Sequence, residues 1–181
     1  MYNPIQIIFK CPRIEKNKKQ IDRDLSVHIL PYPNQISIFN LPICLPLNVK
    51  GFLKNISASH SLIQQIQSEL EKDYQIEVNW ESFNPEIYKK DLVILNSDQE
   101  KEGYILNIEK ENIIIQAASL NGLFYGFQSL RQIILGASKF KSENFEGFIL
   151  PQLNIVDWPC MKIRGIADDI SRGQVDRKSV V

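Results

Sequence analysis

The sequence predicts an α+β fold, a two-layer sandwich in which a mostly antiparallel sheet carries helices on one face. Two segments, one after Ile56 and one after Ser119, repeat apolar residues with the period of an amphipathic helix. Residues 103–117 alternate apolar and polar side chains around a polar turn, which is the pattern of a β-hairpin. Strand-like and helix-like segments follow one another without regular alternation or an internal repeat, which argues against a parallel β-α-β sheet.

Composition and charge narrow the class of protein. The 181 residues are 44% hydrophobic and 23% charged, as in an ordinary globular domain. Because the formal net charge is zero, no overall field would attract nucleic acid or an anionic membrane, and we expect neither partner. The apolar runs are far shorter than the ~18 residues of a membrane span. The first residues lack the charge order of a secretory signal, so the cytoplasm is the default compartment.

Cysteine and histidine usage gives no sign of a metal or redox site. Cys11, Cys44 and Cys160 are widely spaced and odd in number, so we expect free, buried thiols. His28 and His60 are isolated from other ligand-type residues, so we expect neither to bind metal or act as a base. No metal and no cofactor is predicted.

The first third of the chain predicts short strands after a polar start. Residues 1–24 end in a polar run of mixed charge, so we expect a lead-in, with order beginning at Leu25. Residues 25–40 predict two short strands around a proline-marked turn. Residues 41–52 predict a strand at a sheet edge, because prolines are tolerated mainly there.

The first helix is predicted from Leu62, Ile66 and Leu70, which recur every fourth residue, with Ser57 or Ser59 as its cap. Two strands are predicted after it, at residues 75–80 and 91–96.

The hairpin and second helix are the clearest local signals. Tyr104, Leu106 and Ile108 alternate on one arm of the hairpin, and Ile113 and Ile115 on the other. The apolar face of the helix that follows contains Leu120, Leu123, Phe124, Phe127, Leu130 and Ile134.

We expect Ser119 to cap this helix and Gly136 to follow its end. Gly122 and Gly126 each cost about 1 kcal/mol relative to alanine in a helix, which predicts close packing on the sheet. Residues 137–150 are polar and predict a loop, and residues 153–159 predict a short strand that leads to a junction.

Several motifs carry a family resemblance. The stretch "ILPYPNQISI" is followed by "EGYILNIEKENIIIQAASLNGLFYGFQSLRQII" and then by "NIVDWPCMKIRGIADDISRG". Together they resemble the N-terminal accessory domain of family 20 glycoside hydrolases, the β-N-acetylhexosaminidases, continuing into the first strand of their catalytic TIM barrel. The matching residues in the middle stretch are Glu102, Gly103, Tyr104, Gly122, Phe124, Tyr125, Gly126, Gln128, Leu130 and Gln132, while Ser129 replaces the usual threonine.

The residues after the junction favour family 20 over family 84, whose related accessory domain precedes a different pattern. The matching residues are Arg164, Gly165, Asp169, Ser171 and Arg172. Two departures are the pair Gly173-Gln174, where the family has histidine and an aromatic residue, and the additional carboxylate of Asp168.

By this resemblance, Arg164 binds hydroxyls of a terminal N-acetylhexosamine, since a planar guanidinium can donate to two sugar oxygens. A structural ion pair of Arg164 with Asp168 or Asp169 is the alternative. Asp169 and Arg172 would support the strand and its following loop. The adjacent acids are a weak signal for paired-carboxylate catalysis, since neighbouring strand residues point to opposite faces.

The resemblance also implies a division of the chain. Residues 1–24 are the lead-in, 25–150 the accessory domain, 151–175 the junction and first barrel strand, and 176–181 a non-native tail. Only 17 residues follow Arg164, whereas an eight-fold barrel takes ~250.

The sequence therefore predicts an N-terminal fragment of an exo-β-N-acetylhexosaminidase, inactive alone, whose catalytic Asp-Glu pair lies outside this chain. A fragment of a family 84 enzyme and a stand-alone carbohydrate-binding module are the alternatives.

Overall fold

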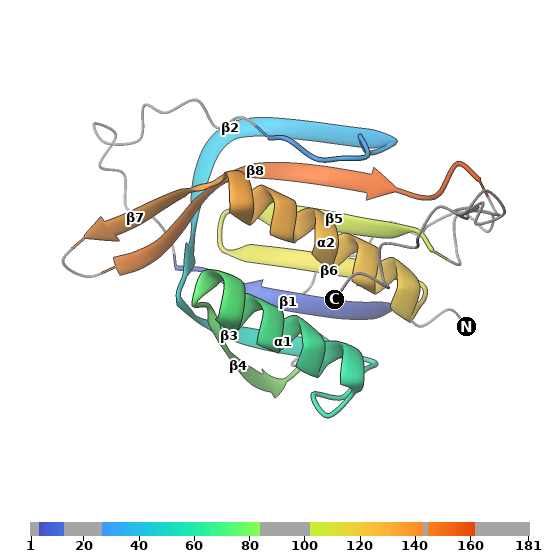
Figure 1. Ribbon diagram of the computed structural model, residues 1–181, viewed down its shortest axis with the longest axis horizontal. Helices are drawn as coiled ribbons and strands as arrows, with labels where there is room; N and C mark the ends of the chain where they lie inside the picture. Colours follow the sequence, from blue (N-terminus) through green and yellow to red (C-terminus); the bar gives the residue numbers. More distant parts are fainter. Residues whose placement is uncertain (1–3, 13–26, 84–101, 143–144, 162–181) are drawn as a thin grey trace, which may run out of the picture.

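The computed structural model describes residues 4–12, 27–83, 102–142 and 145–161. Within these ranges, eight strands form one sheet and two helices cover one of its faces (Figure 1). The elements are β1 (Ile5–Lys10), β2 (Gln35–Pro46), β3 (Asn48–Lys54), α1 (Ser61–Tyr74), β4 (Glu77–Ser82), β5 (Tyr104–Glu109), β6 (Asn112–Ala117), α2 (Leu120–Gly136), β7 (Ser138–Ser142) and β8 (Phe145–Asp157).

The sheet is mostly antiparallel, as predicted. Its strand order is β2-β8-β5-β6-β1-β3-β4, and β7 pairs with β8 beside this path. Only β3 and β4 pair in parallel among the described strands, and α1 provides the crossover between them. The barrel strand predicted for residues 161–167 lies outside the described residues except for Met161, which is not in a strand.

The main core lies between the sheet and the two helices. Side chains alternate along each strand, so that Ile7 and Phe9 of β1 point into this core while Ile8 points to the opposite face. On that opposite face Ile8 packs with Phe52 and Ile114 in a second, smaller cluster. In Figure 1, α2 lies over β5 and β6, and α1 lies towards the β3–β4 side.

The N-terminal lead-in predicted for residues 1–24 is wrong for residues 5–10. These residues form β1, which pairs with β6 on one side and β3 on the other. The apolar patch is short, but both neighbouring strands satisfy its backbone hydrogen bonds, and Ile7 and Phe9 are almost completely buried. Residues 13–24 lie outside the described part of the chain.

The strand predictions for residues 25–52 need a second correction. Residues 27–34 form no strand, and one strand, β2, runs from Gln35 to Pro46 with a bulge between Phe39 and Pro42. The bulge lets the pairing with β8 continue past Pro42, which has no N–H to donate. The predicted edge position is confirmed for residues 41–46, since β2 ends the sheet. It is wrong for residues 48–52, which belong to β3 and pair with β1 on one side and β4 on the other.

The loop predicted for residues 137–150 is also wrong. This segment forms β7 and the first part of β8, which pair with each other as a hairpin. β8 runs on to Asp157, so the predicted boundary at residue 150 falls inside a strand. Pairing with β2 along most of its length explains why a polar, glycine-bearing sequence is extended here.

Both predicted helices are confirmed, with one change of cap. The predicted apolar face of α2 is buried at Leu123, Phe127, Leu130 and Ile134, but Leu120 is 38% exposed and Phe124 is only half-buried. His60, and neither Ser57 nor Ser59, caps α1: its Nδ1 accepts a hydrogen bond from the backbone N–H of Leu62 at 3.2 Å. Ser119 caps α2 as predicted, and Gly136 is the last residue of that helix. The strand predicted at residues 91–96 lies outside the described residues.

The two glycines of α2 pack against the sheet as predicted. A Cβ at Gly122 would lie 2.3 Å from the carbonyl oxygen of Gly103, and one at Gly126 would lie 2.6 Å from Cγ2 of Ile115. Any larger residue at position 122 would therefore push the helix away from the start of β5.

Arg131 connects the two helices. Its guanidinium nitrogens lie 2.8 Å from a carboxylate oxygen of Glu69 and 2.8 Å from one of Asp73, both on α1. The contact with Glu69 has the distance of an ion pair without the alignment of a hydrogen bond. Burial alone would lower the pKa of Arg131, but Tyr74 and the two carboxylates outweigh burial and raise it, so the link stays charged.

The prediction of free, buried thiols is confirmed for Cys11 and Cys44, whereas Cys160 is free but exposed, because it lies beyond the end of β8 at the cleft. In the described ranges, no helix combines the length and the apolar character that crossing a membrane requires.

Candidate functional site

The site residues predicted from sequence, Arg164, Asp169 and Arg172, lie outside the described residues, as does Asp168. Their roles remain predictions. The described chain ends at Met161, and Met161 itself borders a cleft at the end of the sheet.

This cleft has a volume of about 400 Å³ and is built from four segments that are far apart in sequence. It lies where β5 begins and β8 ends, at the right-hand end of the sheet in Figure 1. The segments are residues 29–34, the start of β5 with Glu102, one side of α2, and residues 157–161.

Asp157 is the centre of the hydrogen bonds in the cleft. One of its carboxylate oxygens accepts from the backbone N–H of Asn34 at 3.0 Å and from Nδ2 of Asn34 at 2.8 Å. The other accepts from the hydroxyl of Tyr104 at 3.2 Å. Asn34 also donates from Nδ2 to the carbonyl oxygen of Trp158 at 2.6 Å, so a single amide connects residues 34, 157 and 158.

The Tyr104 hydroxyl links this cluster to α2. It lies 2.6 Å from Oγ of Ser129, and either oxygen can donate. Burial, and then the neighbouring carboxylate of Asp157, raise the pKa of Tyr104 well above its ordinary value, although the hydrogen bond with Ser129 opposes them. The hydroxyl therefore stays protonated and acts as a donor and acceptor between β5, α2 and β8.

Gln132 attaches the segment before β2 to α2. Its Oε1 accepts from the backbone N–H of Leu30 at 2.8 Å, and its Nε2 donates to the carbonyl oxygen of Leu30 at 3.0 Å. The peptide bond between Leu30 and Pro31 is cis. The side chain of Leu30 is left 80% exposed at the rim of the cleft, because only its backbone is held.

The chemistry of this cleft is that of a structural junction. Both oxygens of Asp157 accept hydrogen bonds from the protein, so this carboxylate is engaged in holding segments together. Nowhere in the described ranges do three histidine, cysteine, aspartate or glutamate side chains gather as metal ligands would.

The tryptophans occupy different environments. Trp80 is half-buried, donates from Nε1 to Oε1 of Gln67 at 2.9 Å and packs against Phe9 with ring centroids 6.0 Å apart. Trp158 lines the cleft.

The motifs found in the sequence include every segment of this cleft, but the sequence did not indicate that these segments lie together. The quoted stretches that begin at Ile29 and Glu102, and the one that contains Asp157, supply all four walls. The sequence analysis did not assign a role to Asn34 or Asp157. Both lie inside motifs of the family resemblance, and this was the signal that could have pointed to them. Their hydrogen bonds span 123 positions along the chain, which no local pattern can indicate.

Comparison with known proteins identifies the family of this domain. A family model described as glycosyl hydrolase family 20, domain 2, matches residues 26–158, which is more than half of the chain.

The chain belongs to the glycosyl hydrolase family 20, domain 2, family.

Relatives of this domain occur within much longer proteins. A β-hexosaminidase of Porphyromonas gingivalis (strain ATCC BAA-308 / W83) is 25% identical over 173 residues, covering 91% of this chain and 21% of the relative. The chain therefore spans about a fifth of the length of that protein.

Solved structures share the fold of the family 20 domain. An exo-β-N-acetylglucosaminidase from Vibrio harveyi, solved in complex with N-acetylglucosamine, matches with a TM-score of 0.54 and 18% identity over 78% of this chain and 21% of that chain. An inactive mutant of the Vibrio harveyi enzyme matches with a TM-score of 0.53 and 18% identity over 76% of this chain and 20% of that chain.

The family match includes three of the four walls of the cleft and the start of the fourth. Asn34, Tyr104, Ser129, Gln132 and Asp157 all lie between residues 26 and 158. The hydrogen-bonded junction is thus part of the family 20 domain, and the chain leaves that domain beside it.

Proposed function

We propose that this chain is the N-terminal part of an exo-β-N-acetylhexosaminidase, which hydrolyses terminal β-linked N-acetylhexosamine. The match of residues 26–158 to family 20, domain 2, is the observation that carries the proposal. It is supported by the curated relative, a β-hexosaminidase, and by the fold shared with the exo-β-N-acetylglucosaminidase of Vibrio harveyi.

The proposed reaction retains the anomeric configuration and uses the substrate's own 2-acetamido group as the nucleophile, one of the exceptions to the usual pair of carboxylates. An Asp-Glu pair in a following catalytic domain would carry it out. The aspartate would orient the acetamide, and the glutamate would protonate the leaving oxygen. We propose that neither residue belongs to this chain and that the chain alone is inactive.

In this proposal Arg164 is the residue of this chain that touches substrate. Its guanidinium would donate to hydroxyls of the terminal sugar, with Asp169 and Arg172 holding the strand and loop around it. The described domain would position this strand, since Asp157 is fixed by hydrogen bonds only seven residues before Arg164 (164 − 157).

The test compares two proteins on a chromogenic β-N-acetylglucosaminide: this chain of 181 residues, and the product of the same coding region extended downstream. We expect turnover by the extended protein only. A hydrogen bond to a charged group contributes about 1.5–3 kcal/mol, so Arg164→Ala in the extended protein should lower kcat/KM by roughly 10- to 150-fold.

Two outcomes would contradict the proposal. Turnover by this chain alone would show that it contains its own catalytic groups. An extended protein without activity on β-linked N-acetylglucosamine or N-acetylgalactosamine would remove the assigned substrate class. Saturable binding of N-acetylglucosamine to the short chain would instead favour a carbohydrate-binding module.

A further inference from the structure

The strands at the borders of the sheet differ in how well they are protected against pairing with another molecule. The sheet ends at β2 on one side and at β4 on the other, and β7 borders it beside β8. A border strand has backbone N–H and C=O groups on its outer edge that can pair with a foreign strand. Proteins prevent this with charged side chains, prolines, bulges or very short strands at the edge. The residues of each border strand therefore indicate whether its edge is open to a partner.

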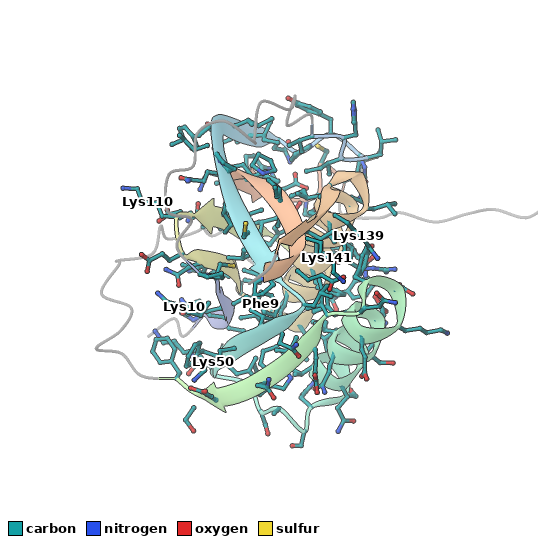
Figure 2. All side chains as sticks on the ribbon, turned by 90° about the vertical axis from the view of Figure 1, so that its left-hand side faces the viewer. Phe9, Lys10, Lys50, Lys110, Lys139 and Lys141 are labelled. Atoms are coloured by element: carbon teal, nitrogen blue, oxygen red, sulfur yellow. The ribbon has the colours of Figure 1, made fainter. Side chains whose placement is uncertain are left out.

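Charged side chains protect β4 and β7. Both strands are short, with six and five residues. β4 contains Glu77 and Glu81, and Glu81 forms an ion pair at 2.8 Å with Lys50 of the neighbouring β3. β7 contains Lys139 and Lys141. Figure 2 shows Lys50, Lys139 and Lys141 from the end of the sheet at which β7 lies. Two copies of either strand, placed edge to edge, would bring like charges together, which opposes pairing.

The first half of β2 has no such protection. β2 is twelve residues long and contains no charged residue. Its second half is protected by Pro42, Pro46 and the bulge between Phe39 and Pro42. Residues 35–39 precede the bulge and contain neither proline nor charge. Within the described ranges β2 pairs with β8 alone, so residues 35–39 have one unpaired edge, which we call the open edge.

The side chains of the open edge are suited to pairing with a further strand. Ile36 packs against the main core, and Ile38, two residues on, lies on the same face and is 44% exposed. Phe39 points to the opposite face and is 53% exposed. β-Branched and aromatic residues stabilise neighbouring strands through cross-strand contacts. Apolar side chains that stay exposed beside an unpaired strand therefore mark an interaction surface.

We propose that the open edge joins two copies of this chain through antiparallel pairing around a two-fold axis at Ser37. In this register Ser37 lies opposite Ser37 of the second copy, and Ile36 lies opposite Ile38. Residues directly opposite each other in an antiparallel pair share a face of the sheet, so the four isoleucines gather on the helix face. On the other face, Phe39 of each copy lies beside Gln35 of the other. The dimer would thus contain one continuous sheet.

A second copy fits this edge because the contact is self-complementary. A two-fold contact places the same residues of both copies together, which is favourable only where those residues do not repel one another. Residues 35–39 contain no charge and the formal net charge of the chain is zero, so neither the contact nor the overall field separates two copies. With Ser37 on the axis, the paired residues end at Phe39, just before the bulge begins. The pairing requires no catalytic group and does not depend on the proposed function.

Because each copy contributes only a short stretch of strand, the interface is small and we expect a weak, reversible dimer. The experiment is sedimentation equilibrium of this chain at increasing concentration. Ser37→Lys and Ser37→Glu each place two like charges at the axis, and each should raise the Kd of the dimer at least about 10-fold. An equimolar mixture of the two variants should dimerise again, because lysine then lies opposite glutamate. Asn79→Glu, at an exposed position on β4, is the matched control and should dimerise like the parent chain.

Several results would overturn the proposal. The first is a chain that stays monomeric up to about 1 mM, where even a weak specific contact would be populated. The second is a pair of Ser37 variants that dimerise like the parent chain, or a mixture of the two that stays monomeric. Both variants should keep the circular dichroism of the parent chain, since Ser37 is exposed.

Two further results would assign the contact elsewhere and overturn the proposal as well. A dimer that resists both Ser37 variants but dissociates with Leu135→Glu would lie on α2, where Leu135 is 77% exposed. A dimer formed by this chain but not by the extended protein would mean that the following domain covers the open edge.

Discussion

The close approach of α2 to the start of β5 gives the sharpest test of the packing. The Gly122→Ala substitution adds a single methyl group, which would lie 2.3 Å from the carbonyl oxygen of Gly103. The oxygen belongs to the backbone of a segment that leads directly into β5, so it cannot rotate aside. Either α2 or the start of β5 has to move.

Two opposing contributions to the free energy of unfolding set the expected effect of Gly122→Ala. Alanine is favoured over glycine in a helix by about 0.8–1.0 kcal/mol. Overpacking that forces backbone to shift costs typically about 1–3 kcal/mol. Since the Cβ would also lie 3.1 Å from Cβ of Ala117, the upper part of that range applies. The free energy of unfolding should therefore fall by about 1–2 kcal/mol, or roughly 2–8 °C in Tm for a domain of this size.

Gly136 is the matched control, because it is the last residue of the same helix and a Cβ there would meet nothing within 4 Å. Gly136→Ala should leave stability unchanged or raise it by up to about 1 kcal/mol. Urea unfolding followed by circular dichroism measures both variants against the parent chain. If Gly122→Ala proves as stable as Gly136→Ala, the close packing does not constrain the helix and the reasoning is refuted.

Three further predictions concern the junction, the thiols and the helix pair. Asp157→Ala removes three hydrogen bonds to a carboxylate and should lower the free energy of unfolding by about 2–3 kcal/mol, measured by urea denaturation. A thiol reagent should modify Cys160 in the native chain, and Cys11 and Cys44 only after unfolding. Burial raises the pKa of Cys11 to about 12 and that of Cys44 to about 11, from 9.0, so above pH 9 the unfolded chain loses these protons first. Stability should then fall by about 1.4 kcal/mol per pH unit and thiol up to pH 11, and replacing both cysteines by alanine should flatten the slope. Arg131→Met breaks both ion pairs to α1 and should cost about 1 kcal/mol, since the pairs are partly exposed; no loss in urea unfolding would mean that they do not stabilise the helix pair.

The sequence by itself determined the elements whose signal is local. In the hairpin β5–β6, the alternating side chains and the turn lie within fourteen residues (117 − 104 + 1). A sequence pattern of this length therefore covers the whole hairpin and is enough to predict it. The same holds for α2, where Ser119, the apolar face and the two glycines specify the start, the buried side and the close packing. The edge position of β2 followed from the chemistry of proline, which lacks an N–H wherever it occurs.

The tertiary structure alone decided the elements whose partners are distant. Ile5–Lys10 is a strand because β3 and β6, about 40 and 100 residues away, pair with both of its edges. Residues 145–150 are extended because β7 pairs with residues 145–149 and β2 with residues 147–150, although their own composition is that of a loop. A short polar or apolar run has no fixed conformation until another segment satisfies its backbone hydrogen bonds.

The cleft shows the same limit at the level of function. Family motifs indicated that Tyr104, Gln132 and the residues around Asp157 belong together, but their spacing in sequence gave no geometry. The hydrogen bonds that join Asn34 to Asp157 and Leu30 to Gln132 cross 123 and 102 positions. The sequence determined which polar side chains the cleft could contain. The folded sheet places the start of β5 beside the end of β8, and only this pairing brings those side chains together where the chain leaves the domain.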